Sequence, residues 1–374
     1  MTELGQAKSP ADTRPAGVVS SVPVASADLR LIEPGPDDRR AWWRAVVDSD
    51  PDALPEHTPE WVDAICASGS YQDATRFYAD ADGRRFVVPL VRRTGVAGWG
   101  GWLLSPPPAW GMGGVVGRGL DESTLRQILT DLVGLGAQRV WIRPDPTRAG
   151  LWEAATDDSS LAVGRHAHVV DLDGGVDAVW ARLHRGTRKY VRRAERAGVR
   201  IEVDRAGDLL DTYYDLYLTS VDRWAARQHE PLRLARWRAR RRDPLEKLVR
   251  MSHHLGPDFV LTMAFVDDEP AYGSIMLLGQ TAHVTRSAMD VDRVGSTKAG
   301  SLVQWSMLQL ACAHGCRTYH LGESGRSQPL AQFKESFGAV GIDYAEHRYE
   351  RLPFTVADHR LRAVAKKVLR FRDV

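Results

Sequence analysis

One lysine near the end of the chain has the type and setting of a residue that does chemistry. Lys334 lies in SQPLAQFKESFGAV, residues 327–340, in a chain that uses 43 Arg but only 7 Lys. At about 100° per residue, it falls at the inner edge of the helical stripe formed by Leu330, Phe333 and Phe337. A charge there must snorkel, be paired or serve a site, because burying it alone is costly. A fixed, compact ammonium can stabilise negative charge that develops during a reaction.

The helix that carries Lys334 comes late in an alternating set of elements. Ser327 is a suitable N-cap, Pro329 suits the first turn, and Gly338 ends the helix. Upstream, the sequence predicts an antiparallel meander, then a helix ending at Gly315 and the short strand RTYHL. The predicted order is strands at 259–266, 271–278 and 281–288, a helix at 300–314, a strand, the Lys334 helix and a strand at 341–350.

The first half of the chain repeats this order. ATRFYADADGRRFVVPLVRR predicts a hairpin with a turn at Asp82-Gly83, GMGGVV a strand, and ESTLRQILTDLVGLG a helix. The strand QRVWIRP, a short helix at 149–156 and the closing strand RHAHVVDL follow. The helix ends Gly136 and Gly315 are 179 residues apart, and the same offset aligns RVWI with TYHL. Because the halves share negligible identity, the pattern indicates a repeat of architecture.

The repeat and the length predict an α/β fold with mixed sheets flanked by helices, built as two domains. A chain of 374 residues exceeds the usual size of one core, and the boundary is expected near Gly174-Gly175. The predicted parts are a disordered leader at 1–27, an N-terminal domain at 28–174, a C-terminal domain at 175–350 and a basic helix at 351–374.

Composition indicates an ordinary globular protein, with 43% hydrophobic and 26% charged residues and no run of 18 apolar residues. Cys66, Cys312 and Cys316 cannot form a disulfide framework. Cys312 and Cys316 lie one helical turn apart without nearby His, so we expect small core residues and no metal site. The leader does not have the pattern of a signal peptide, and the chain is therefore predicted to be cytoplasmic.

The net charge of +2 hides a segregation of basic residues. Residues 182–205 hold nine Arg and Lys against three acids, residues 223–250 ten against three, and residues 351–372 seven against one. Solvated helix faces are the ordinary explanation, and a polyanionic ligand is the competing one. The basic tail helix is expected to dock on the body, with contact to a membrane surface as the weaker alternative.

Four stretches occur in the order and spacing of a known family. They are Trp180 to Val199 (WARL…RKYVRRAERAGV), Tyr217 to Arg223 (YLTSVDR), AGSLVQWSMLQLACAHG at 299–315 and LAQFKESFG at 330–338. Together they resemble the FemAB-like branch of the GNAT acyltransferase superfamily, over residues 60–350 and most strongly from 175 to 340. The resemblance implies two GNAT-like domains in tandem, in agreement with the repeat.

The resemblance also implies an activity, the transfer of an amino acid from aminoacyl-tRNA to an amine. In characterised members that amine usually belongs to a peptidoglycan precursor, and in some relatives to a natural-product scaffold. The pair that matches Phe333 and Lys334 lies at the family's reaction centre, where the lysine is thought to stabilise the transition state. The matching position of Arg223 is implied to hold substrate phosphate. The chain lacks the long coiled-coil arm that some members insert.

Ester aminolysis passes through a tetrahedral oxyanion, which a fixed Lys334 ammonium would stabilise. Glu323 and Asp290, both near expected strand ends, are candidate general bases, with a loop salt bridge as the alternative for each. Trp224 is a candidate to stack on a base or sugar, with core packing as the alternative. The candidates for binding substrate or its phosphates are Arg188, Lys189, Arg192, Arg193, Arg223, Arg227, Trp224 and Ser287.

Two other functional classes stay open. An acyl-CoA-dependent N-acyltransferase would bind the CoA diphosphate through Arg/Gln-x-x-Gly-x-Gly/Ala, and neither RVGSTKAGSL at 293–302 nor GVVGRGLDES at 114–123 has that spacing. A non-catalytic tRNA- or partner-binding module would have no need of the Phe-Lys pair. GMGGVVG lacks the context of a dinucleotide loop, and GESG departs by one residue from the nucleophile elbow, so both are rejected.

The sequence thus predicts an amide-forming transferase with aminoacyl-tRNA as co-substrate, acyl-CoA as the alternative donor, and no permanently bound cofactor. It leaves the acceptor amine and the oligomeric state open.

Overall fold

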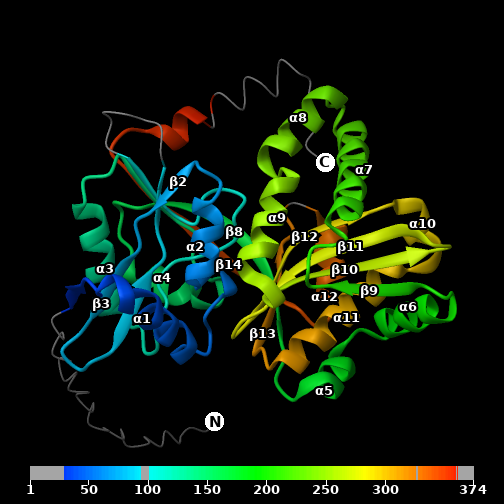
Figure 1. Cartoon of the computed structure of the whole chain (residues 1–374), viewed down its shortest axis with the longest axis horizontal. Coiled ribbons are helices and arrows are strands. Elements are labelled where there is room, and N and C mark those ends of the chain that lie inside the picture. Colours follow the sequence, from blue (N-terminus) through cyan, green and yellow to red (C-terminus); the bar gives the residue numbers. More distant parts are fainter. Residues whose placement is uncertain (1–28, 94–100, 326, 359, 361–374) are drawn as a thin grey trace, which may run out of the picture.

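The structure, a computed structural model, describes residues 29–93, 101–325, 327–358 and 360. Three strands form a small sheet, and eleven strands form one mixed sheet that runs through both halves of the chain (Figure 1). The predicted α/β fold, with mixed sheets flanked by helices in both halves, is confirmed. The predicted leader and most of the predicted basic tail helix lie outside the described residues. None of the described helices is long and apolar enough to cross a membrane.

The elements alternate as the sequence predicts. In the first half they are β1 (Arg30–Ile32), α1 (Pro36–Ser49), η1 (Pro55–His57), α2 (Pro59–Cys66), β2 (Tyr71–Asp73), β3 (Arg76–Ala79), β4 (Arg85–Val88), β5 (Val91–Arg93), β6 (Trp102–Ser105), α3 (Glu122–Gly134), β7 (Arg139–Ile142), η2 (Pro146–Arg148), α4 (Ala149–Ala155) and β8 (Leu161–Asp171). In the second half they are α5 (Gly175–Arg182), α6 (Arg185–Arg196), β9 (Arg200–Asp204), α7 (Leu210–Gln228), α8 (Leu232–Arg242), α9 (Leu245–Leu255), η3 (Gly256–Asp258), β10 (Phe259–Val266), β11 (Glu269–Leu277), β12 (Ala282–Met289), α10 (Val291–Thr297), α11 (Ala299–His314), β13 (Thr318–Glu323), α12 (Gln328–Glu335) and β14 (Val340–Glu350).

The second half follows its prediction closely. β10, β11 and β12 form the antiparallel meander, with Asp267 and Asp268 in the left-handed conformation at the first turn. β10 is buried on both faces, as its apolar run FVLTMAFV predicts. α11 then crosses over the sheet and ends at Gly315, whose φ of 88° favours glycine. β13 returns parallel to β12.

The first half matches its prediction except at one strand. β3 and β4 pair as the expected hairpin, and β7 follows α3. The strand predicted at GMGGVV is wrong, because these residues form only isolated bridges, Gly113 with Pro144 and Val116 with Val87. β6 takes the expected strand position and pairs in parallel with β7. The glycines instead allow close packing, since a Cβ at Gly113 would lie 2.8 Å from the Ser105 hydroxyl oxygen.

The architectural repeat is visible in the parallel strand pairs. β7 begins at Arg139 and β13 at Thr318, which preserves the offset of 179 residues. Each follows a helix and lies parallel to the strand before that helix. The predicted domain boundary at Gly174-Gly175 falls at the start of α5, where both glycines have positive φ.

The two halves are joined by the exchange of their last strands. The large sheet has the order β2-β5-β6-β7-β14-β8-β13-β12-β11-β10-β9. β14 therefore lies between β7 and β8 of the first half, and β8 lies between β14 and β13 of the second. The sequence predicts both strands but not their exchange. Neither half can be removed without breaking the sheet.

Three hydrophobic clusters hold the helices against the sheet. α5, α6 and α11 pack on one face of the second half, and α7 and α9 on the other (Figure 1). The cluster under α7 and α9 also includes residues of α1 and α2, so one core spans both halves. A third cluster packs α3 and α4 on the first half.

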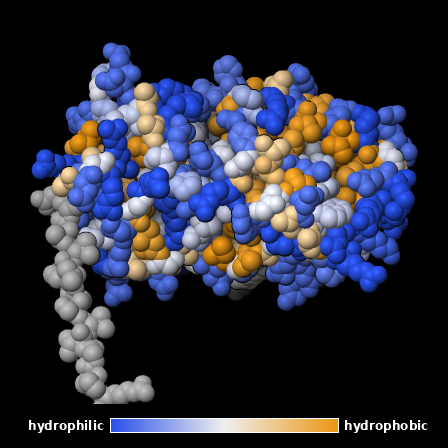
Figure 2. All heavy atoms as spheres, turned by 90° about the horizontal axis from the view of Figure 1, so that it is seen from below, coloured by the Kyte–Doolittle hydropathy of each residue, from blue (hydrophilic) through white to orange (hydrophobic). Residues whose placement is uncertain are grey.

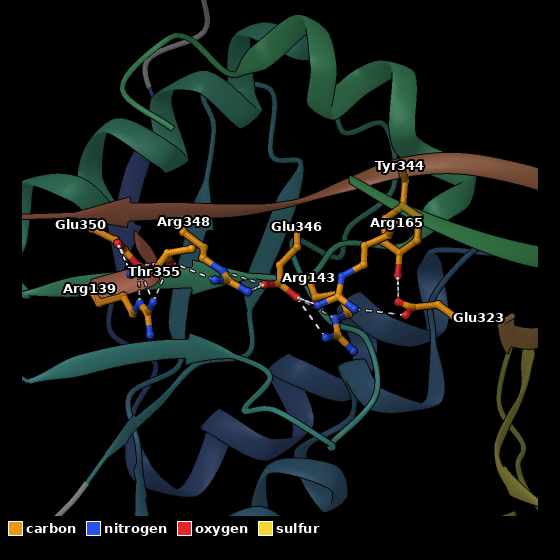
Figure 3. Close-up of polar contacts among 9 residues, drawn as sticks. All are labelled: Arg139, Arg143, Arg165, Glu323, Tyr344, Glu346, Arg348, Glu350 and Thr355. Atoms are coloured by element: carbon orange, nitrogen blue, oxygen red, sulfur yellow. Dashed lines mark hydrogen bonds and ion pairs between the residues drawn. The ribbon is translucent and has the colours of Figure 1, made fainter. Parts of the chain in front are cut away.

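A chain of ion pairs follows the exchanged strands (Figure 3). Glu346 on β14 is fully buried and binds Arg143, Arg165 and Arg348. The Nη2 atoms of Arg143 and Arg165 each lie 2.9 Å from Glu346 Oε2. Burial disfavours the charged carboxylate, but the three guanidinium groups outweigh it and hold the pKa of Glu346 below its ordinary value. One carboxylate therefore ties strands of both halves together.

We expect Glu346→Gln to lower the free energy of unfolding by about 3–5 kcal/mol, because it leaves buried guanidinium groups without their counter-charge. Urea denaturation of the full chain measures the loss. Since the folded pKa of Glu346 is depressed, its stabilisation is present above the unfolded pKa and is lost as the pH falls through the folded pKa. The difference in the free energy of unfolding between the wild type and Glu346→Gln should therefore become smaller in acid.

Glu122→Gln is the matched control, because Glu122 forms an exposed pair with Arg126 one turn along α3. We expect this variant to lose less than about 0.5 kcal/mol. Equal losses for the two variants would contradict the role given to Glu346.

Candidate functional site

The candidate site lies where two parallel strands separate. β12 and β13 pair only at Ala282 with Tyr319 and at His283 with His320. Beyond these pairs the strands diverge toward their carboxyl ends. A cavity of about 400 Å³, which we call the wedge cavity, opens between them and the first half. It is lined by Ala109, Gly111, Met112, Arg143, Ala167, Arg242, Asp243, His283, Val284, Thr285, Arg286, Gly322, Glu323 and Tyr344.

Lys334 reaches the end of β13 from the neighbouring helix α12. Its side chain is buried, and Nζ donates a hydrogen bond of 2.8 Å to the main-chain oxygen of Glu323. No carboxylate forms an ion pair with it among the residues that the structure describes. Snorkelling and ion pairing, the two ordinary explanations for a lysine in this position, therefore do not account for Lys334. The apolar stripe beside it is formed by Phe333 and Phe337, whose rings lie 5.1 Å apart.

The predicted stripe was wrong at one position. Leu330 is 40% exposed, because α12 begins only at Gln328 and its first turn lies away from the core.

Burial lowers the pKa of the Lys334 ammonium to about 8, an effect that the nearby Glu323 opposes. His168 on β8 also faces this region, and its pKa is lowered by burial and by the charge of Lys334. The site therefore holds a cation at neutral pH that is weakly solvated. Such a cation interacts strongly with any negative charge that forms beside it.

Glu323 lines the wedge cavity and also accepts the Lys334 hydrogen bond at its main-chain oxygen. Its Oε1 accepts a hydrogen bond of 2.7 Å from the Tyr344 hydroxyl, and its Oε2 lies 3.2 Å from Arg165 Nη1. Arg165 also binds Glu346, so the chain of ion pairs that starts from Glu346 ends at the Glu323 carboxylate (Figure 3). The structure brings Lys334, Phe333 and Glu323 together as the sequence predicts, and it adds Tyr344 and Arg165, which the sequence analysis missed.

Asp290 does not join this group. Its carboxylate caps α10 by accepting hydrogen bonds from the backbone N–H groups of Asp292 and Arg293, and it pairs with the Arg293 side chain at 3.0 Å. It does not line the wedge cavity. The geometry gives Asp290 the role of a helix cap, which was the salt-bridge alternative, and lends no support to a role as general base.

Arg223 lies beside the same end of β12. Its Nη1 donates to the main-chain oxygen of Met289 at 3.0 Å, while its buried Nε has no partner among the described residues. Burial and the neighbouring Arg227 lower the pKa of Arg223. Trp224 is 37% exposed and stands under the Arg223 guanidinium, so the alternative of core packing for this ring is wrong. The half-buried Arg223 and the exposed Trp224 and Arg227 thus form one group beside the end of β12.

The basic helix α6 packs beside α11. Some of its arginine and lysine side chains contact the rest of the protein, and others are exposed. Arg188 binds the last carbonyl groups of α5, and Arg192 lies over the Trp180 ring, so both have structural contacts. Lys189 and Arg193 are exposed and make no ion pair with any described residue. Seen from below, the right-hand edge of the molecule, where α6 lies, is mostly hydrophilic (Figure 2).

Ser287 lies away from the cavity in a polar group beneath α11. Its hydroxyl is 2.9 Å from that of Ser274, and Tyr272, Gln304 and Tyr319 continue the group. Across the described part of the chain, no three His, Cys, Asp or Glu residues are grouped so that they could hold a metal ion.

The far wall of the cavity is a charged cluster that the sequence analysis missed. Asp243, between α8 and α9, binds Lys247 at 2.9 Å and Arg286 at 2.6 Å. Lys247 and Arg286 also donate to the main-chain oxygen of Ala109 in the first half. Burial lowers the pKa of Lys247 to about 7. A signal existed in the sequence, because Arg286 breaks the apolar alternation of β12, but its partner could not be predicted.

Comparisons with known proteins agree with this geometry. Residues 181–335 match the family described as Acetyltransferase (GNAT) domain. The chain is similar in fold to FemX, with a TM-score of 0.63 and 14% identity over 88% of this chain and 99% of that chain. It is also similar to a conserved protein of unknown function from Bacteroides thetaiotaomicron VPI-5482, with a TM-score of 0.51 and 12% identity over 86% and 99% of the two chains.

No curated protein matches the sequence. Residues 181–335 of the chain match a GNAT domain, and the similarity to FemX, at 14% identity, is a similarity of fold.

We expect the Lys334 ammonium to lose its proton near pH 8, because its charged form is poorly solvated. Reductive methylation with labelled formaldehyde followed by NMR gives one signal for each of the 7 Lys. The signal missing from Lys334→Met identifies the residue. Glu323→Gln should lower the midpoint further, because it removes the negative charge that opposes the shift. A midpoint near the ordinary value of 10.5 would contradict the burial described here.

Proposed function

We propose that this FemAB-like GNAT protein forms an amide bond by moving an amino acid from aminoacyl-tRNA to an amine, with Lys334 stabilising the transition state. The observation that carries the proposal is the position of the Lys334 ammonium. It is buried, lacks a carboxylate partner among the described residues, and is held by the Glu323 carbonyl where β12 and β13 separate. A cation fixed in this way fits a site where negative charge appears only during the reaction.

The ammonium has the hydrogen-bonding capacity that the reaction needs. When an amine attacks the ester carbonyl of the donor, the carbonyl oxygen becomes negative and the carbon tetrahedral. Lys334 carries three N–H donors, of which one is used on the Glu323 carbonyl within the described structure. The others are available to the oxyanion. The carbon–nitrogen bond then remains, the carbon–oxygen ester bond breaks, and the ribose hydroxyl of the tRNA leaves.

The residues after β12 support aminoacyl-tRNA over acyl-CoA as the donor. In ordinary GNAT enzymes the CoA diphosphate binds backbone N–H groups where a helix begins after this strand. Here the short helix α10 comes between β12 and the crossover helix α11, and its first N–H groups already bind the Asp290 carboxylate. That carboxylate adds a negative charge between the strand and the start of α11, which would repel a diphosphate.

Basic residues on both sides of α10 support an RNA ligand. Arg223 and Arg227 lie on α7 beside the end of β12. On the other side, Lys298 follows α10 and stands over the ring of Tyr190 on α6, the helix that exposes Lys189 and Arg193. Phosphates spread along an RNA strand fit this distribution better than one diphosphate.

The acceptor side of the proposal rests on the wedge cavity. The cavity is lined in part by Arg242 and Asp243, which lie next to α9, whereas α12 and α6 lie against the cluster on the other face of the sheet. Its volume of about 400 Å³ accommodates the amine-bearing end of a substrate rather than a whole cell-wall precursor. A peptidoglycan precursor and a natural-product intermediate both remain candidates.

The donor is tested by incubating the full chain with amines from a cell extract and with either labelled aminoacyl-tRNA or labelled acetyl-CoA. We expect transfer from aminoacyl-tRNA that is abolished by RNase. Transfer that survives RNase and requires CoA would overturn the proposed donor. No transfer from either donor would favour a non-catalytic tRNA-binding scaffold.

We expect Lys334→Met to lower kcat by about 10²–10³-fold, the loss typical for one donor to an oxyanion. The free energy of unfolding should change by less than about 1 kcal/mol, because a weakly solvated charge and one hydrogen bond are lost together. Gln332→Met is the control, since Gln332 is exposed on the same helix. Full activity of Lys334→Met would remove the lysine from the mechanism.

The basic face of α6 is tested by the salt dependence of tRNA affinity. We expect Lys189→Ala with Arg193→Ala to reduce the slope of log Kd against log salt by about 2, because two phosphate contacts are lost. Arg126→Ala, on an exposed helix of the first half, should leave the slope unchanged. An unchanged slope in the double variant would show that this face is only solvated.

A further inference from the structure

A buried histidine–glutamate pair stands at the closed end of the wedge cavity. His283 Nδ1 is hydrogen-bonded to Glu56 Oε1, and the two side chains are only 6% and 0% exposed. His283 lines the cavity and belongs to the last strand pair before β12 and β13 separate. Glu56 comes from η1 in the first half, so the pair bridges the two halves. Neither residue has a role in the function proposed above.

The first half is shaped to hold Glu56 in place. His57, the next residue, accepts a hydrogen bond from the Leu54 N–H at its Nδ1, and its Nε2 lies 3.0 Å from the Gly113 carbonyl. Gly111 has a φ of 85° and passes so close that a Cβ there would overlap the Glu56 carboxyl group. The GMGG stretch therefore has a purpose beyond packing, because its glycines allow a carboxylate to lie beneath the cavity floor.

The arrangement selects one tautomer of His283. Although burial opposes ionisation, His283 keeps the pKa of Glu56 below its ordinary value, so the carboxylate is charged. A carboxylate accepts hydrogen bonds only, and His283 must therefore carry its proton on Nδ1. This leaves the lone pair on Nε2, which has no partner among the described residues. The same logic holds the base in other carboxylate–histidine pairs.

We propose that His283 is the general base that removes a proton from the attacking amine, and that Glu56 is the positioning residue that fixes its tautomer and stabilises the imidazolium. This inference rests on the proposed amide-forming reaction. The amine loses one proton to Nε2 as its nitrogen bonds to the carbonyl carbon. When the carbon–oxygen bond breaks, the leaving ribose oxygen takes a proton, and His283 returns to its neutral form.

The spacing in the wedge cavity fits this division of roles. His320 is opposite His283, and Glu323 follows three residues later, or about 10 Å along the strand. If a base, the amine, the carbonyl group and the Lys334 ammonium lie in line, the base and the ammonium are about 8 Å apart. This distance includes a hydrogen bond of about 3 Å at each end. The end of β13, where the Glu323 carbonyl holds Lys334, is thus at a suitable distance from His283 for base and cation to act on one tetrahedral centre.

Glu323 is less suited to the role of base that the sequence analysis gave it. Both of its carboxylate oxygens already accept hydrogen bonds, one from Tyr344 and one from Arg165. His283 has a free acceptor atom at the cavity.

Other titratable and charged groups surround His283. The ring of His320 lies 6.1 Å away, and burial lowers the pKa of His320 and of His57, so both are neutral near pH 7. The groups that face His283 or the same cavity are Glu56 and His57 from the first half, His320 and Glu323 from β13, Arg286 from β12, Arg143 after β7, Tyr344 from β14, and Arg242 and Asp243 between α8 and α9.

The first test measures transfer from labelled alanyl-tRNA to hydroxylamine, a small amine that is unprotonated at neutral pH. His283→Asn keeps a donor for Glu56 but has no base, and we expect kcat/KM to fall by about 10²–10⁴-fold with unchanged tRNA affinity. Glu56→Gln should lower kcat with little change in tRNA affinity, because a neutral amide cannot balance the charge of the imidazolium that forms. His253→Asn, which removes an exposed imidazole on α9, should match the wild type.

The second test is independent of turnover. In a long-range proton–nitrogen NMR spectrum of the histidine-labelled chain, the signal missing from His283→Asn should show a proton on Nδ1 and none on Nε2. A proton on Nε2, or a wild-type rate and pH profile for His283→Asn, would overturn the role of His283. No transfer by the wild-type chain, either from alanyl-tRNA or from acetyl-CoA, would overturn the proposed function and the base together.

Discussion

The buried carboxylate of Glu346 and its three arginine partners hold the two halves of the molecule together. They lie where β14 of the second half enters between β7 and β8 of the first. Arg165 extends the same contacts to Glu323, whose main-chain oxygen fixes Lys334. The position of the Lys334 ammonium is thus coupled to the contact between the halves, and an error in strand exchange would displace it.

The exchange also explains why the site needs both halves. The second half supplies the separating strands β12 and β13 and the helix of Lys334, all of which lie within the residues that match a GNAT domain. The first half closes the cavity with Ala109, Gly111 and Met112 and supplies Glu56 from below. The two halves share an architecture but contribute different parts of the site. One supplies the separating strands, and the other forms part of the wall of the wedge cavity.

The two ends of the wedge cavity differ in the charged groups beside them. At the end of β13, Glu323 lines the cavity and its main-chain oxygen holds Lys334, a cation whose pKa burial lowers to about 8. At the closed end, the pair of His283 and Glu56 is nearly sealed from solvent and leaves one nitrogen lone pair at the cavity. The ionised cluster around Asp243 separates them from bulk solvent on the side of α8 and α9. Low solvent exposure strengthens each of these interactions.

The sequence predicted correctly the elements that depend on residues close together in the chain. The meander β10–β12, the crossover helix α11, the strand β13 and the inward position of Lys334 all follow from apolar periodicity, turn residues and caps. The exchange of β8 and β14 could not be predicted, because either strand satisfies the pairing requirements of either half. Contacts across the halves, such as His283 with Glu56 or Arg165 with Glu323, join residues more than 150 positions apart and leave no spacing signal. Asp290 shows the reverse error, since a strand-end carboxylate that resembled a base is a helix cap.

The central claim is that Lys334 recognises the transition state and not the substrate, and differential binding tests it most directly. A phosphonate that mimics the tetrahedral adduct of an alanyl ester and an amine carries the oxyanion permanently, whereas the corresponding amide does not. The account predicts that Lys334→Met weakens the phosphonate by about 100-fold or more and the amide by less than about threefold. Equal weakening of both ligands would contradict it.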